Sequence, residues 1–132
     1  IIRLTHPQFY SREYGRFTSQ AFSVNGAGSS VIDVTCIAAS GLCICDHIQK
    51  YYPGIGGEPP VFKRFSVADM PDGADLVQSD SGSGDKCHYD VTKVSSNKLG
   101  KLIKRVPIEH FETCDENGVR AVTAVDCENW LK

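Results

Sequence analysis

Two cysteines, an aspartate and a histidine lie within five residues in the stretch Cys43-Ile-Cys-Asp-His47. Thiolate and imidazole groups bind zinc, a thiol beside a histidine can act as a nucleophile, and cysteines in an oxidising compartment form disulfides. Structural zinc sites usually take their ligands from two close pairs, and no second close cysteine pair occurs in this chain. We therefore predict neither a metal site nor a cofactor.

The cysteine count favours disulfides. Six cysteines are an even number and a high density for a short chain, which is typical of proteins made in an oxidising compartment. We predict three disulfides, formed by Cys36, Cys43, Cys45, Cys87, Cys114 and Cys127. Residues i and i+2 cannot easily bridge each other, so Cys43 and Cys45 need different partners, which we expect among Cys87, Cys114 and Cys127.

Acid-base chemistry is the alternative to binding. Small secreted ribonucleases use a histidine and a glutamate as base and acid, and His88, His110 and Glu112 could supply such groups. The competing interpretation is that these are exposed strand residues, which we favour, so no catalytic residue is assigned. Asp80 and Asp85, in a stretch rich in serine and glycine, lack the spacing of a calcium loop and indicate a solvated loop.

The chain length and the net charge limit the possible folds and partners of this protein. The chain has 132 residues, which predicts a single domain over 1–132. Its net charge of -2 gives no broad cationic field, so we expect no nucleic-acid partner. No apolar run approaches the roughly 20 residues of a membrane-spanning helix. The chain begins Ile-Ile-Arg-Leu, without an initiator methionine, and we expect the mature form of a secreted protein.

In the first half, the pattern predicts one main helix over about 41–52, with Ser40 as its N-cap. Residues 1–16 indicate an edge strand or a surface arm. Residues 16–24 and 29–38 read as two strands of a hairpin, turned at Asn25-Gly26.

In the second half, residues 61–67 and 86–94 predict strands, separated by a long loop with a short strand at 76–78. A short helix over 97–105, capped by Asn97, and a hairpin turned at 115–118 follow. That hairpin would place Cys114 opposite Ala121. The sum is an α+β fold: a small disulfide-stabilised domain of antiparallel strands packed with one main helix.

A glycine-rich loop follows the predicted helix, and it is flanked by prolines. Backbone without side chains can approach a partner closely, and rigid flanks lower the cost of ordering the loop. The predicted binding residues are Gly54, Ile55, Gly56, Gly57 and Glu58. The competing interpretation is an ordinary helix-to-strand connection.

Two resemblances concern function. With one domain, six cysteines and no catalytic motif, the chain resembles the small secreted cysteine-rich effector proteins of fungi. This resemblance implies a secreted virulence protein that binds an extracellular or host protein. Gly54, Gly56 and Gly57 are similar to the Gly-x-Gly-Gly loop of chagasin-type inhibitors, which implies inhibition of a papain-like protease. The other two loops of those inhibitors have no counterpart in this sequence. The alternative function is a secreted toxin or small hydrolase.

Overall fold

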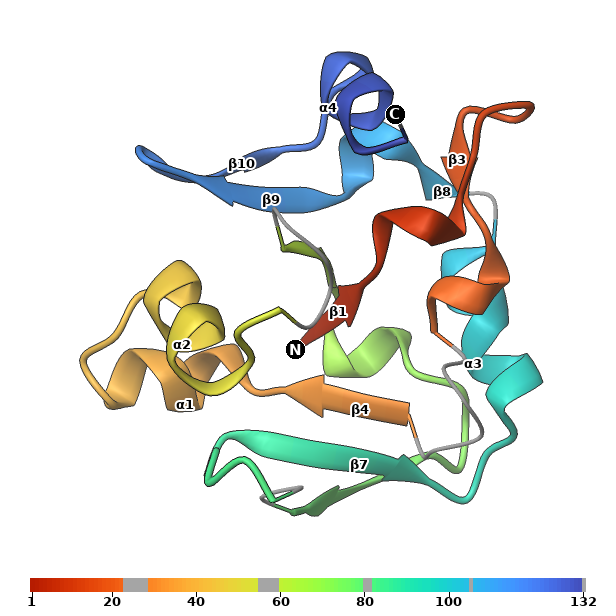
Figure 1. Ribbon diagram of the computed structural model, residues 1–132. Helices are drawn as coiled ribbons and strands as arrows, with labels where there is room; N and C mark the ends of the chain where they lie inside the picture. The colour runs from red at the N-terminus through yellow and green to blue at the C-terminus, as the bar shows by residue number, and fades with distance from the viewer. Residues whose placement is uncertain (23–28, 55–59, 80–81, 105, 132) are drawn as a thin grey trace.

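The computed structural model describes residues 1–22, 29–54, 60–79, 82–104 and 106–131. These residues form ten short antiparallel strands in two sheets, four α-helices and two disulfides (Figure 1). The predicted fold class, a small disulfide-stabilised α+β fold, is confirmed. No helix in these ranges has the length and apolar character needed to cross a membrane.

The elements are short. The strands are β1 (Ile2–Thr5), β2 (Tyr10–Ser11), β3 (Arg16–Phe17), β4 (Ser29–Ile32), β5 (Val61–Arg64), β6 (Asp75–Gln78), β7 (His88–Thr92), β8 (Val106–Pro107), β9 (Glu112–Asp115) and β10 (Gly118–Ala121). The helices are α1 (Val34–Ala39), α2 (Ile44–Tyr51), α3 (Ser96–Ile103) and α4 (Ala124–Trp130). Four 3-10 turns join them: η1 (Pro7–Phe9), η2 (Ser19–Ala21), η3 (Val67–Asp69) and η4 (Ile108–His110).

The large sheet has the strand order β10-β9-β5-β1-β4-β7-β6, and the small sheet has the order β2-β3-β8. β1 is therefore the central strand, with β5 on one side and β4 on the other. The expectation of an edge strand or surface arm over residues 1–16 was wrong for β1, whereas β2 does lie at the edge of the small sheet. Ile2 is fully buried in the sheet, and the N-terminal ammonium donates to the carbonyl of Phe65 at 2.8 Å.

Side chains alternate between the two faces of the large sheet, so that each face has its own core. On one face, Ile2, Ile32 and Phe62 pack with residues of α1 and α2. On the other face, Val31 and Val61 pack with residues of α3, α4 and the small sheet. The sheet is thus covered on both sides, with α1 and α2 apart from α3 and α4 (Figure 1).

The first predicted hairpin was wrong: strands begin at Arg16 and Ser29 as expected, but both are shorter than predicted, and they pair with other strands and not with each other. After β3 the chain turns into η2, and after β4 it enters α1. Asp33 starts α1 as its N-cap, because its carboxylate accepts the backbone N–H of Thr35 at 3.0 Å. The apolar residues after Asp33 therefore form a helix in place of a longer strand. The expected turn at Asn25-Gly26 lies outside the described residues.

The main helix was predicted at the right place, but its start was wrong. α2 begins at Ile44, and Cys43 is its N-cap. Ser40 instead ends α1, where its backbone N–H and its hydroxyl both bond to the carbonyl of Cys36. Gly41 has a φ of +77°, which breaks the helical path between α1 and α2. The chain therefore makes two short helices where we expected one.

The later elements agree better with the sequence. The strands near 61–64, 76–78 and 88–92, the helix at 96–103 and the final hairpin are all present. The helix cap is Ser95, whose hydroxyl accepts the N–H of Lys98, and not Asn97. The hairpin register places Cys114 opposite Val119, two residues from the expected partner.

Candidate functional site

The cysteines close two of the three predicted disulfides. Cys36 of α1 bonds to Cys87, and Cys45 of α2 bonds to Cys114 of β9. The expectation that Cys45 pairs with one of three later cysteines is confirmed. The expectation of three bridges was wrong, because Cys43 and Cys127 carry free thiols. Cys127 lies in α4, where we expected a strand.

The histidine of the Cys43–His47 stretch is buried against the core. His47 is 1% exposed, and its Nε2 lies 3.0 Å from Oδ2 of the fully buried Asp85. The hydroxyl of Tyr52 donates to the same oxygen at 2.5 Å. The other oxygen of Asp85 accepts the backbone N–H of Cys87 at 2.8 Å. We refer to His47, Tyr52 and Asp85 as the buried triad.

Asp85 is the charged centre of the buried triad. Burial raises the pKa of its carboxyl, but the hydrogen bonds from Tyr52 and Cys87, together with the adjacent His47 imidazole, favour the carboxylate more strongly. The net result is a pKa below the ordinary value for aspartate. The triad therefore holds a negative charge beside α2. Its contacts fix His47 in the middle of the helix and Tyr52 at its end.

The buried triad is a structural anchor and not a reaction centre. A His–Asp pair activates a nucleophile only when that nucleophile can meet a substrate. Here the third group is Tyr52, whose hydroxyl already donates a hydrogen bond to Asp85. All three side chains are buried.

Two residues of the buried triad also belong to a group of potential metal ligands. His47, Asp85 and Cys87 place potential ligand atoms within 4.8 Å of one another. The Cys87 sulfur is bonded to Cys36, so it offers no thiolate to a metal ion. Two donor groups remain, and Asp85 already accepts hydrogen bonds on both oxygens. Among the described residues, this group thus lacks the closed ligand set of a structural zinc site.

The alternative catalytic residues lie in two separate parts of the fold. His88 lies in β7 and is 2% exposed, with Nδ1 bonded to the carbonyl of Ser79. Glu112 lies in β9, where it pairs with Arg64, and His110 is exposed in η4 just before it. Three strands separate β7 from β9 in the sheet, which corresponds to about 19 Å at the usual strand spacing. His88 therefore does not pair with His110 or Glu112, which lie two residues apart in the chain.

The predicted binding segment, Gly54 to Glu58, begins at an exposed Gly54 with a φ of +80°. Ile55, Gly56, Gly57 and Glu58 lie outside the described residues. Both flanks of the segment are fixed. Before it, Tyr52 is 7% exposed and bonded to Asp85. After it, the carbonyl of Pro60 accepts the Thr113 hydroxyl at 2.7 Å, and Val61 enters the sheet.

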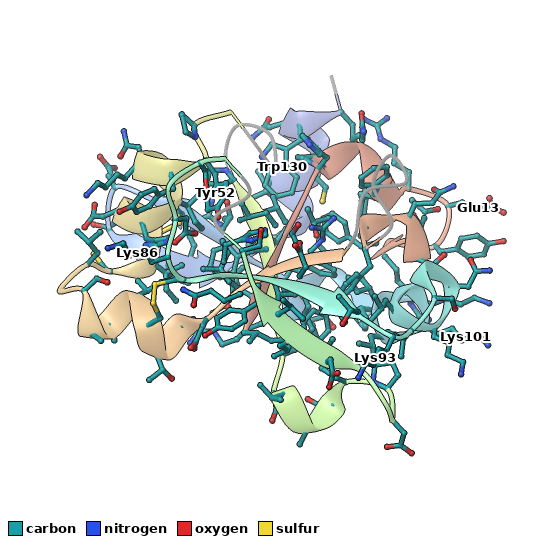
Figure 2. The ribbon with its side chains drawn as sticks, turned by 90° about the horizontal axis from the view of Figure 1, so that it is seen from below. Glu13, Tyr52, Lys86, Lys93, Lys101 and Trp130 are labelled. Carbon is teal, nitrogen blue, oxygen red and sulfur yellow. A yellow bond between two sulfur atoms is a disulfide. The ribbon has the colours of Figure 1, made fainter. Side chains whose placement is uncertain are left out.

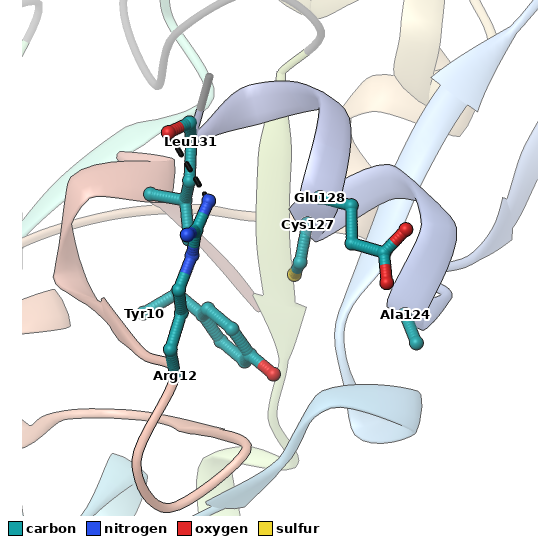
Figure 3. A pocket seen from close by; sticks show the side chains of 6 residues that line it. All are labelled: Tyr10, Arg12, Ala124, Cys127, Glu128 and Leu131. Atoms are coloured by element: carbon teal, nitrogen blue, oxygen red, sulfur yellow. Dashed lines mark hydrogen bonds between the residues drawn. The ribbon is translucent and has the colours of Figure 1, made fainter.

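A separate pocket of about 520 Å³ lies between β2 and α4 (Figure 3). Its lining residues are Tyr10, Arg12, Ala124, Cys127, Glu128 and Leu131. The Cys127 sulfur points toward the Tyr10 ring, and Arg12 donates to the carbonyl of Leu131 at 3.1 Å. Burial, together with the nearby charge of Asp126, raises the pKa of the Cys127 thiol to about 12. This thiol is therefore not a nucleophile at neutral pH.

Tyr52 and Asp85 were not recognised from the sequence. Tyr52 reads as the last apolar residue of a helix, and Asp85 reads as part of a solvated loop. No local pattern links them, because 32 residues lie between the two positions and only the folded chain brings them together. Comparison with protein-family models, with curated proteins and with solved structures gave no match.

Proposed function

We propose that this chain is a secreted binding protein of effector type, which acts on an extracellular or host protein. Its two disulfides support an origin in an oxidising compartment. The most concrete form of the proposal is inhibition of a papain-like protease by residues 54–58. The observation that carries it is the anchoring of both flanks of this segment.

The anchoring matters because binding must overcome the entropy of ordering a loop. The buried triad fixes the end of α2 two residues before Gly54. The Cys45–Cys114 bridge ties α2 to β9, and β9 pairs with β5 directly after the segment. The scaffold therefore holds the two flanks in fixed positions and lowers the entropy that a partner must remove.

The test is inhibition of papain by the oxidised protein. We expect Gly56→Trp/Gly57→Trp to weaken inhibition by at least about tenfold, because bulky side chains block close approach of the backbone. The matched control is Gln8→Trp/Gln20→Trp, which adds the same bulk at exposed glutamines in η1 and η2. We expect the control to inhibit as the parent protein does.

Two results would count against the proposal. If the parent protein does not inhibit papain at about 100 μM, protease inhibition is no longer part of the proposal. Equal inhibition by the glycine variant and the parent protein would remove residues 54–58 from the binding surface. Circular dichroism of each variant shows that the fold is retained.

A further inference from the structure

One segment of this acidic protein is rich in basic side chains. Residues 93–105 contain five basic residues and no acidic residue, although the whole chain has a net charge of -2. α3 lies in this segment and buries Leu99 and Ile103 in the core. Lys98 and Lys101 are therefore exposed on its outer surface, and Lys101 points away from the protein in Figure 2.

The end of α3 reaches a depression of about 400 Å³, which we call the basic depression. It brings together residues of two Lys-Arg steps that lie 41 positions apart, Lys63-Arg64 and Lys104-Arg105. Arg105 itself is not among the described residues. The lining residues of the basic depression are Lys63, Arg64, Phe65, Asp69, Leu102, Lys104, Val106, Pro107 and His110.

Two of its ammonium groups lack a carboxylate partner. Arg64 is paired with Glu112 at 3.2 Å, and the Asp69 carboxylate accepts the backbone N–H of Ser66 in the cap of η3. Lys63 donates only to a neutral carbonyl, that of His110, at 3.3 Å. Within the described ranges, neither Lys63 nor Lys104 forms an ion pair.

The basic depression also has apolar walls. Phe65 is 7% exposed, and Leu102 and Val106 pack against the core while contributing to the lining. The Nζ atom of Lys63 lies 5.8 Å from the centre of the Phe65 ring. A ligand that matches these walls therefore needs an apolar group beside a negative charge.

We propose that the basic depression binds an acidic peptide segment of a partner protein. Carboxylates of the peptide pair with Lys63 and Lys104, and a neighbouring apolar side chain contacts Phe65, Leu102 and Val106. A depression of this size accommodates a few side chains, whereas a nucleic acid needs a row of phosphate contacts. Asp69 in the lining and Glu112, which pairs with Arg64, also limit the cationic surface to a patch too small for a long polyanion. This proposal does not depend on protease inhibition by residues 54–58.

The experiment measures fluorescence anisotropy of a fluorescein-labelled peptide, Glu-Leu-Glu-Phe-Glu-Leu, with the oxidised full chain at low salt. We expect Lys63→Glu/Lys104→Glu to weaken binding by at least about tenfold. The matched control, Lys98→Glu/Lys101→Glu, changes the net charge equally on the exposed face of α3, and we expect less than about a threefold change. Lys63→Gln/Lys104→Gln gives the same test with a smaller perturbation of folding.

Several outcomes would overturn this inference. Equal losses in the two charge-reversal variants would show general electrostatic attraction and no defined site. Equal binding of an all-glutamate peptide would show that the apolar walls take no part. Binding of single-stranded RNA or of phosphatidylserine vesicles, but not of the peptide, would assign the lysines to a polyanion. Absence of peptide binding by the parent protein would refute the site directly.

Discussion

Arg120 of β10 holds Asp126 of α4 with two hydrogen bonds, from Nη1 to Oδ2 at 2.7 Å and from Nη2 to Oδ1 at 2.8 Å. The same guanidinium reaches Asp115 of β9 through Nε at 2.7 Å. Asp126 also closes a capping box with Thr123 at the start of α4. One arginine thus joins both strands of the final hairpin to the helix that follows.

Arg120→Met should destabilise the protein by roughly 1 kcal/mol at pH 7, because two carboxylates lose a partly exposed partner. Arg120 holds the pKa of Asp126 well below its ordinary value. This stabilisation is complete above the unfolded pKa of aspartate and disappears as the pH falls through the lower folded value. Urea unfolding at pH 7 and near pH 2 measures the difference, which should shrink in acid. Arg16→Met, which removes an exposed arginine that forms no ion pair with the described residues, is the control.

Asp85→Asn should cost about 3 kcal/mol, because it removes the charge that faces the buried His47. Tyr52→Phe removes one hydrogen bond of the same triad and should cost about 1–2 kcal/mol. The pKa of Asp85 is lowered, so the contribution of its carboxylate is present above the unfolded value near 4 and declines in acid. Tyr51→Phe, at the last residue of α2, keeps the ring that packs against His47; it is the control and should be nearly neutral. Equal stability of Asp85→Asn and the parent protein would contradict the anchoring role.

The free thiols give a direct test of disulfide number. Unfolded, non-reduced protein should take up two alkyl groups, because Cys43 and Cys127 are unpaired. Native protein should take up one, because Cys43 is exposed and Cys127 is buried. Intact mass spectrometry after iodoacetamide treatment counts both. An unfolded protein that takes up none has a third bridge, as the sequence alone suggested.

Alkylation of Cys43 should also respond to its neighbour. The hydrogen bond from its thiol to the Asp46 carboxylate, and the charge of that carboxylate, raise the pKa of Cys43. Asp46→Asn removes the charge and should speed alkylation at pH 8 several-fold, because more thiolate is present. Asp72→Asn, which changes another exposed aspartate, should leave the rate unchanged. Equal alkylation rates in Asp46→Asn and the parent protein would show that the contact with Asp46 does not raise the pKa of the Cys43 thiol.

Phe111→Ala should cost about 3–5 kcal/mol, since the Phe111 ring is fully buried and lies 4.0 Å from that of Phe17. The two rings connect the small sheet to the final hairpin, so loss of the Phe111 ring should lower the free energy of unfolding of the whole protein and not only loosen one element. Thermal unfolding followed by circular dichroism measures the effect. Val119→Ala on the partly exposed edge strand is the control and should change stability by less than about 0.5 kcal/mol.

Local patterns were most reliable where one short segment contains the whole signal. The final hairpin could be predicted because its turn residues and both strands are adjacent in sequence. The strand at 76–78 and the helix at 96–103 could be predicted for the same reason. α1 was missed because its β-branched residues resemble a strand, whereas the Asp33 cap makes them helical.

The sequence by itself determined the class of the fold, the position of the main helix and that Cys45 pairs with one of three later cysteines and not with Cys43. Only the tertiary structure decided which cysteines pair, since bridging requires α-carbons within about 7 Å and that distance is set by packing. The tertiary structure likewise placed β1 at the centre of the sheet and Asp85 beside His47. These relationships join residues that are far apart in the chain, and burial, not local propensity, selects them.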